Sequence, residues 1–172
     1  MESLIKSTTK KNSLVDILAV ISNNSSAKGL IVANKKKVPG IFVVSKKNFE
    51  KKVAKYLEDI DLICLAGFMQ VLSADFVRAW SSRLINIHPS YLPEFKGLNA
   101  QEQAIKAKAS STGCTVHYVN PKIDSGEIIM QKKVKILKKD NTESLSKKIL
   151  IEEHKIYPKA LQMIAKRLLK KK

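Results

Sequence analysis

The sequence contains little cysteine and has no long apolar run. Its two cysteines, Cys64 and Cys114, both lie in apolar, strand-like stretches, so we expect buried free thiols in a reducing cytoplasm and no disulfide framework. No apolar run approaches the roughly 20 residues that a membrane-spanning helix needs. Residues 1–4 lack the basic and apolar regions of a signal peptide. We therefore expect a cytoplasmic protein without a membrane partner.

Arginine is also scarce, although the formal net charge is +17. Only Arg78, Arg83 and Arg167 are arginines among the 32 basic residues, and the lysines are scattered along almost every segment. Proteins that read nucleic acids concentrate arginine for its bidentate geometry and interleave aromatic side chains. We interpret the lysines as a solvated surface and expect no nucleic-acid partner. The histidines and cysteines show no metal-ligand spacing, so no metal site is predicted.

Strand-like and helix-like segments alternate along the chain, which predicts an α/β fold with an open, mainly parallel sheet flanked by helices. The chain shows neither an internal repeat nor a linker, so residues 1–172 are expected to form one domain. Strands are predicted at residues 14–22, 39–44, 61–68, 84–88, 112–119 and 128–134. The third should be central and covered on both faces. The last two flank a short loop and should be antiparallel neighbours.

Helices are predicted between these strands by apolar residues at helical spacing. They should end near residue 33, span residues 45–58, begin after Ser73, span residues 100–108, and run to the C-terminal end from a cap at Asn141 or Thr142. The terminal helix should bury one apolar stripe, formed by Leu145, Ile149, Ile156, Leu161 and Ile164. Residues 90–98, which include Pro93 and Gly97, are too irregular for a regular element and indicate a mobile loop.

Two short runs carry the candidate chemistry. The first is Asn86-Ile87-His88-Pro89-Ser90-Tyr91-Leu92-Pro93, and the second is Gly113-Cys114-Thr115-Val116-His117-Tyr118, followed by Ile123-Asp124-Ser125-Gly126. They place an amide, an imidazole and a carboxylate at strand ends or in the loops that leave them, where an open α/β sheet forms its reactive crevice. An imidazole with a carboxylate partner can move protons during an acyl-type transfer.

These runs resemble the signatures of glycinamide ribonucleotide formyltransferase, as do Ala66-Gly67-Phe68-Met69 and Glu153-His154-Lys155-Ile156-Tyr157-Pro158, all in one register from about residue 3 to residue 157. The resemblance implies a Rossmann-like sheet with an antiparallel strand near the C-terminal part. It also implies transfer of a formyl group from 10-formyltetrahydrofolate to the amine of N1-(5-phosphoribosyl)glycinamide in purine synthesis. The partners would be small molecules, and the protein a monomer or homodimer.

The resemblance assigns the transfer chemistry to Asn86, His88 and Asp124. Asn86 would stabilise the developing oxyanion, protonated His88 would donate a proton, and Asp124 would raise the pKa of His88 and relay protons. Formylfolate would be held by the segment after Ala66-Gly67-Phe68, by the loop before Asp124 and by Lys46, a set that comprises Lys46, Met69, Gln70, Val71, Leu72, Asn86, Asn120, Pro121, Lys122, Ile123 and Asp124. Met69 as an ordinary core residue is the competing interpretation. His117 is expected to be structural, and His154 is assigned no chemistry.

The acceptor side of the resemblance is less complete. Leu150, Ile151, Glu152 and Glu153 match the stretch that binds the ribose and amine side of the acceptor. Gln70, Lys46 and Pro121 depart from the family's usual residues, which puts donor affinity in doubt because lysine does not replace arginine in bidentate contacts. The family's first strand and glycine-rich phosphate loop have no counterpart in this chain, whose start matches the helix after that loop. We expect Met1 to be an internal methionine, with the native start about a dozen residues earlier; a shortened protein is the alternative.

Three other functions remain open from the sequence. A methionyl-tRNA formyltransferase shares the His-Pro-Ser and Asp-x-Gly elements but carries a further C-terminal domain. A formyltetrahydrofolate hydrolase typically has His-His-Ser where this chain has His88-Pro89-Ser90. A non-catalytic folate-binding relic would explain the missing loop, but the presence of Asn86, His88 and Asp124 argues against it.

Overall fold

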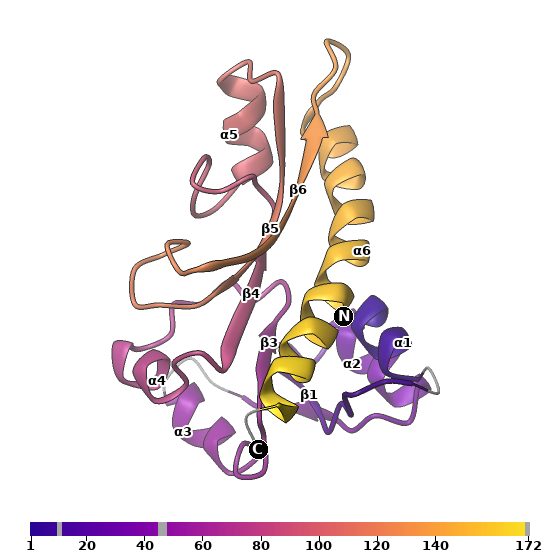
Figure 1. Ribbon diagram of the computed structural model, residues 1–172, viewed down its shortest axis with the longest axis vertical. Coiled ribbons are helices and arrows are strands. Elements are labelled where there is room, and N and C mark those ends of the chain that lie inside the picture. The colour runs from indigo at the N-terminus through magenta and orange to yellow at the C-terminus, as the bar shows by residue number, and fades with distance from the viewer. Residues whose placement is uncertain (10–11, 45–47, 171–172) are drawn as a thin grey trace. The chain divides into compact units, whose positions relative to one another are not determined.

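The computed structural model describes residues 1–9, 12–44 and 48–170, whose helices and strands alternate along the chain (Figure 1). The described residues form two compact units. The first comprises the N-terminal part to Asp61 and the chain from Leu161 onward, and the second comprises Leu62–Ala160. The predicted α/β class is confirmed, with both parallel and antiparallel strand pairs. Its organisation as one domain stays a prediction.

The first unit contains a two-stranded parallel sheet and short helices. Its elements are α1 (Glu2–Thr8), β1 (Val20–Ser22), α2 (Lys28–Lys35), β2 (Gly40–Phe42) and α3 (Phe49–Ala54). β1 and β2 pair in parallel with Val20 opposite Gly40. A small apolar core holds them together, formed by Ile5, Val20, Leu30 and Ala33, with Met1, Ile17, Ala27, Val32 and Val38 packed against it.

Two predictions in this unit are too long. Residues 14–19 are not strand, because backbone groups in this stretch bond to side chains: the Leu14 N–H donates to Gln162 and the Val15 N–H to Ser13. Leu14 and Leu18 are about half exposed, so this stretch is not the predicted buried strand. The described part of the predicted helix at 45–58 is helical only over α3, which ends in tight turns where the N–H of Tyr56 donates to the carbonyl of Val53.

The second unit contains the four-stranded sheet. Its elements are β3 (Ile63–Leu65), α4 (Ala74–Ala79), β4 (Leu84–His88), α5 (Ala100–Lys106), β5 (Ser111–Tyr118), β6 (Ile128–Lys135) and α6 (Thr142–Leu169) as far as Ala160. The strand order is β3-β4-β5-β6. β3 and β4 are parallel, whereas β5 runs antiparallel to both β4 and β6, as predicted for the last two strands. β3 is half-buried at the edge of this sheet, so its predicted central position is wrong.

Capping side chains mark the starts of α4 and α6. The hydroxyl of Ser73 accepts a hydrogen bond from the N–H of Phe76 and starts α4, as predicted. At the start of α6, Asn141 and Ser144 form a reciprocal pair, each side chain accepting from the other's backbone N–H. All five residues of the predicted apolar stripe of α6 are buried.

The part of α6 that belongs to this unit, as far as Ala160, packs against one face of the four-stranded sheet (Figure 1). The hydroxyl of Tyr157 donates to the carbonyls of Leu65 in β3 and Ile85 in β4, at 2.7 and 3.3 Å. Successive side chains of a strand point to opposite faces. Cys114 and Thr115 of β5 therefore point to opposite faces. The pKa of the Cys114 thiol is raised by burial and then by the charges of Glu153 and Glu152, which agrees with α6 lying on the Cys114 face. The other face carries the polar side chains of Asn86, His88, Thr115 and His117.

Candidate functional site

Two strands present polar side chains on the face of the sheet opposite α6. The register pairs Asn86 of β4 with His117 of β5, and His88 with Thr115. These pairs share one face because each strand contributes alternate residues. His88, Thr115 and His117 are buried and Asn86 is half-buried, so the polar groups on this face are largely removed from water.

The loop between β5 and β6 adds a carboxylate to this face. One Asp124 oxygen, Oδ2, lies 3.3 Å from Nδ1 of His88, and the other, Oδ1, lies 3.6 Å from Nε2 of His117. The backbone N–H of Gly97 also donates to Oδ2, at 2.8 Å. The structure therefore brings together Asn86, His88 and Asp124, the three residues to which the sequence assigned the transfer chemistry.

Gly126 allows the loop to close over the sheet. A Cβ built on this residue would stand 1.7 Å from the carbonyl oxygen of Tyr118, a distance that no side chain tolerates. Asp124 itself has a positive φ of 45°, which few residues other than glycine, asparagine and aspartate adopt. The Asp-x-Gly spacing is thus a geometric requirement for folding the carboxylate back toward His88.

His88 has an acceptor at each ring nitrogen. Nε2 lies 2.9 Å from the carbonyl oxygen of Phe95, and Nδ1 faces Asp124. Only the protonated ring can donate to both acceptors at once. Burial nevertheless lowers the pKa of His88 below its ordinary value, and it outweighs the hydrogen bond to Phe95 and the charge of Asp124, which both raise the pKa. The predicted influence of Asp124 is present, since its charge raises the pKa of His88, but desolvation was left out of the prediction and is the larger effect.

Asp124 remains ionised despite its position. Burial by itself raises the pKa of this carboxyl, but the contacts with His117 and with the Gly97 N–H, followed by the charges of the two imidazoles, together bring the pKa below its ordinary value. An ionised carboxylate beside a buried imidazole is an arrangement that can stabilise the imidazolium once it forms. The pair can therefore hold a proton during a reaction even though His88 is mainly uncharged at rest.

Sequence reasoning did not place His117 beside Asn86 and Asp124. It was expected to be structural, but its ring lies between Asn86 and Asp124 and is only 2% exposed. The signal that could have found it is the matching two-residue spacing of Asn86-x-His88 and Thr115-x-His117. If the two strands pair, both residues of each run fall on one face.

A second group of missed residues holds the segment after β4. The hydroxyl of Thr115 donates to the carbonyl of Ser90 and accepts from the N–H of Leu92. Gln131 donates from its amide to the same hydroxyl and to the carbonyl of Leu92. The segment is irregular, as predicted, and it is tied to β5 and β6 before it reaches Phe95, the partner of His88.

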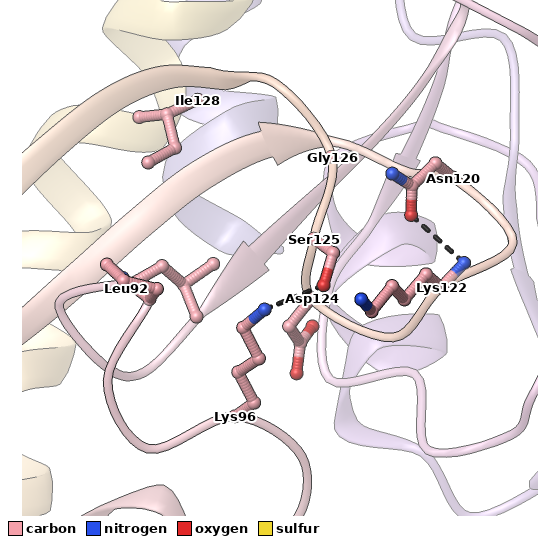
Figure 2. Close-up of a pocket in the computed structure, with 9 residues that line it drawn as sticks. Leu92, Lys96, Asn120, Lys122, Asp124, Ser125, Gly126 and Ile128 are labelled. Carbon is pink, nitrogen blue, oxygen red and sulfur yellow. Dashed lines mark hydrogen bonds between the residues drawn. The ribbon is translucent and has the colours of Figure 1, made fainter.

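A pocket of about 340 Å³ opens beside Asp124, lined by Leu92, Pro93, Lys96, Asn120, Lys122, Asp124, Ser125, Gly126 and Ile128. Figure 2 shows Lys96 reaching to the hydroxyl of Ser125, a hydrogen bond of 2.7 Å. The backbone N–H of Lys122 donates to the side chain of Asn120, which shapes the turn before Asp124. Of the residues predicted to hold the folate, Asn120, Lys122 and Asp124 therefore line one pocket, whereas Pro121 and Ile123 are exposed in the same loop.

The remaining predicted folate residues lie elsewhere. Lys46 lies outside the described residues. Met69, Gln70 and Val71 follow β3 and are exposed, Met69 by 76% and Val71 by 79%, whereas Leu72 is half-buried. The alternative that Met69 is an ordinary core residue is therefore wrong. Large apolar side chains that are exposed in this way are available for a ligand to cover.

The four predicted acceptor-binding residues all lie on α6, which packs against the opposite face of the sheet from Asn86 and His88. Leu150 and Ile151 are about half exposed, and Glu152 pairs with Lys155 at 2.7 Å. Burial raises the pKa of Glu153 to about 7. The structure thus does not group these residues with the catalytic candidates, although Glu153 has the perturbed pKa typical of functional carboxylates.

The remaining side chains bear on nucleophilic catalysis by cysteine and on metal binding. Both cysteines are free, and burial raises the pKa of each thiol to about 12, so neither is a thiolate nucleophile near neutral pH. Among residues 1–9, 12–44 and 48–170, no group of three or more histidine, cysteine or acidic side chains could hold a metal ion. Within the same residues, no helix is both long and apolar enough to cross a membrane.

Comparison with known proteins shows the class to which this chain belongs. The sequence profile described as formyl transferase matches residues 1–161. The chain belongs to the formyl transferase family.

Within the family, the chain is most usefully compared with phosphoribosylglycinamide formyltransferases. The enzyme of that name from Haemophilus influenzae is 38% identical over 150 residues, which cover 83% of this chain and 70% of that protein. The crystal structure of the Anaplasma phagocytophilum phosphoribosylglycinamide formyltransferase superposes with a TM-score of 0.92 at 46% identity, covering 96% of this chain and 81% of that one. The resemblance seen in the motifs is confirmed.

Larger proteins also contain a similar segment. The trifunctional purine biosynthetic protein adenosine-3 of Bos taurus is 44% identical over 172 residues, which cover 96% of this chain but 17% of that protein. The human protein of the same name is 43% identical with the same coverage. The chain therefore spans about one sixth of the length of these relatives.

Proposed function

We propose that this protein transfers a formyl group from 10-formyltetrahydrofolate to the amine of N1-(5-phosphoribosyl)glycinamide, a step of purine biosynthesis in the cytoplasm. The observation that carries the proposal is the cluster of Asn86, His88 and Asp124 on one buried face of the sheet. The family and the names of its similar members support the choice of donor and acceptor. Residues 1–172 would act as one formyltransferase domain on small molecules, as a monomer or homodimer.

The reaction needs one bond to form and one to break. The acceptor amine attacks the formyl carbon, and the formyl oxygen becomes an oxyanion in the tetrahedral intermediate. Asn86 donates an amide N–H to that oxygen, an interaction that is stronger in the intermediate than in the starting amide. The bond between the formyl carbon and the folate N10 then breaks, and N10 leaves with a proton.

His88 and Asp124 manage this proton. The attacking amine loses one proton as its bond to the formyl carbon forms, and N10 gains one as it leaves. His88 holds the proton between these events, and the ionised Asp124 stabilises the resulting imidazolium. Both ring nitrogens of His88 already face acceptors, Asp124 and the carbonyl of Phe95. Donation to the folate therefore requires one of these hydrogen bonds to be exchanged for one to N10.

The substrates would bind to the residues predicted from the resemblance. The folate would lie against Met69–Leu72 and the loop of residues 120–124, which offers backbone groups and the exposed side chain of Ile123. Lys46 belongs to the same proposal. The acceptor would reach the stretch Leu150–Glu153. There a partly protonated Glu153 can donate a hydrogen bond to a ribose hydroxyl or accept one from it.

The test is formyl transfer with purified protein, synthetic glycinamide ribonucleotide and 10-formyltetrahydrofolate, followed through the folate product. Initiator methionyl-tRNA and water serve as competing acceptors, which separates this function from the tRNA-dependent and hydrolytic alternatives. Transfer to glycinamide ribonucleotide alone supports the proposal. Donor binding without transfer to any acceptor would make the protein a folate-binding relic and overturn it.

Two substitutions test the residue roles. Asn86→Ala should lower kcat about a hundredfold or more, since one oxyanion donor is lost. Asp124→Asn should cost at least as much, because the imidazolium loses its charged partner. Matched controls are Asn24→Ala and Asp75→Asn, which remove the same groups from exposed positions and should leave kcat unchanged. Near-normal turnover in Asp124→Asn would remove Asp124 from the mechanism.

A further inference from the structure

His117 is a buried residue that contacts two of the three catalytic candidates. Its Nε2 lies 3.5 Å from the amide nitrogen of Asn86 and 3.6 Å from Oδ1 of Asp124. Its Nδ1 lies 2.8 Å from the carbonyl oxygen of Tyr118. The ring therefore has a backbone partner on one side and catalytic partners on the other.

The backbone contact determines which nitrogen of His117 carries a proton. A carbonyl oxygen can only accept a hydrogen bond, so Nδ1 must be the donor in that contact. The uncharged ring then presents Nε2 as an acceptor, and the amide of Asn86 is the donor within reach. A charged ring donates from Nε2 to Asp124, which is the contact that helps to lower the pKa of that carboxyl, and it cannot accept from Asn86. The orienting contact with Asn86 therefore belongs to the uncharged ring.

The amide of Asn86 needs such a partner to have a defined orientation. It has two N–H groups and one oxygen, and a rotation of the amide exchanges their positions. If one N–H is held by Nε2 of His117, the other stays available for the formyl oxygen. If the amide turned over, its oxygen would face the developing oxyanion and repel it.

We propose that His117 is a positioning residue, which orients the amide of Asn86 through Nε2 so that Asn86 presents an N–H to the formyl oxygen. This role rests on the proposed formyl transfer and assigns His117 no proton of the reaction. A purely structural His117 would need only the Nδ1 contact to Tyr118. The two contacts can be separated because asparagine offers an N–H near the place of Nδ1, whereas glutamine offers an oxygen near the place of Nε2.

The experiment compares His117→Asn with His117→Gln by kcat, KM and unfolding temperature. His117→Asn keeps the backbone contact and should lower kcat by about tenfold to a hundredfold, with KM within about twofold, because the oxyanion donor loses its orientation. His117→Gln keeps an acceptor for Asn86 and should retain kcat within about threefold of the wild type.

A double-mutant cycle shows whether His117 acts through Asn86. In an Asn86→Ala background, His117→Asn should cause no further loss of kcat, because there is no amide left to orient. Effects that multiply in the double variant would overturn the proposal. The proposal would also be overturned if His117→Asn and His117→Gln lost kcat equally and in proportion to the fall in their unfolding temperatures.

The glutamine variant keeps the test decisive if His117→Asn does not fold. A folded His117→Gln with near-wild-type kcat supports the proposal, and one with kcat as low as that of Asn86→Ala overturns it. The outcome is distinguishable from a failure of the proposed function. An inactive wild type removes the function itself, whereas an active wild type without this pattern removes only the role of His117.

Discussion

Replacing Thr115 and Thr112 by valine, one at a time, gives two nearly isosteric changes on the same buried strand. Thr115 is fully buried, and its hydroxyl makes three hydrogen bonds: it donates to Ser90 and accepts from Leu92 and Gln131. Thr112 is 1% exposed, and its hydroxyl has no hydrogen-bond partner among the described residues. Valine removes the same oxygen at both positions, so the difference between the two variants isolates the hydrogen bonds.

The two effects should have opposite signs. Thr115→Val leaves the buried Leu92 N–H and Ser90 carbonyl without this partner, and each orphaned group costs about 1–3 kcal/mol, so a loss of about 3 kcal/mol is expected. Thr112→Val removes a buried hydroxyl that gains nothing in return, which should stabilise the fold by about 1 kcal/mol. For a chain of this size, 1 kcal/mol shifts Tm by about 2–4 °C.

Differential scanning calorimetry at one pH and protein concentration measures both changes. Thr115→Val should unfold about 6–12 °C below the wild type, and Thr112→Val about 2–4 °C above it. Thr115→Val should also lower kcat, because the segment it anchors leads to the Phe95 carbonyl that contacts His88. Shifts of Tm in the same direction, or within about 1 °C of each other, would show that the hydrogen bonds do not have these energies.

Three further predictions each concern a single residue. Gly126→Ala should abolish most transfer activity, because its Cβ would displace the Asp124 loop from the Tyr118 carbonyl; kcat measures this. The pKa of Asp140 is lowered to about 2, chiefly by the hydrogen bond from Lys148, so its contribution to stability is present above its ordinary pKa and disappears as the pH falls toward 2. Tm should therefore drop between about pH 4 and pH 2, and less so in Asp140→Asn. The pKa of Glu153 is raised from 4.5 to about 7, so the wild type should lose stability as the pH rises across this range, about 3 kcal/mol by pH 8, and Glu153→Gln should remove that loss.

Each of these has its own contrary result. A Gly126→Ala protein with normal kcat would mean that the loop closes without the close approach to Tyr118. The same acid slope in the wild type and Asp140→Asn would remove Asp140 from the acid response, and Asp75→Asn serves as the exposed control. If the unfolding temperature of Glu153→Gln changes from pH 5 to pH 8 in the same way as that of the wild type, Glu153 is not desolvated.

Local signals in the sequence were sufficient for several elements. Ser73 caps α4 because its hydroxyl acts within one helical turn, and the apolar stripe of α6 follows from the helical repeat alone. The antiparallel pairing of β5 with β6 follows from the short loop between them. The predictions failed where backbone partners lie far away in the sequence. Residues 14–19 are apolar enough for a strand, yet the Leu14 N–H finds a side chain 148 residues later and no neighbouring strand.

The candidate site divides in the same way. The sequence by itself identified Asn86, His88 and Asp124 as the candidate residues, because their motifs show which chemical groups are present. It also contains Gly126, which allows the loop to fold back. Only the tertiary structure decided that His117 lies beside Asn86 and that Thr115 and Gln131 hold the segment leading to Phe95, since these contacts depend on strand register. It also decided that the pKa of His88 falls and does not rise. The sign of that shift depends on how much water the surrounding chain excludes, and desolvation is a property of the folded molecule that no single motif encodes.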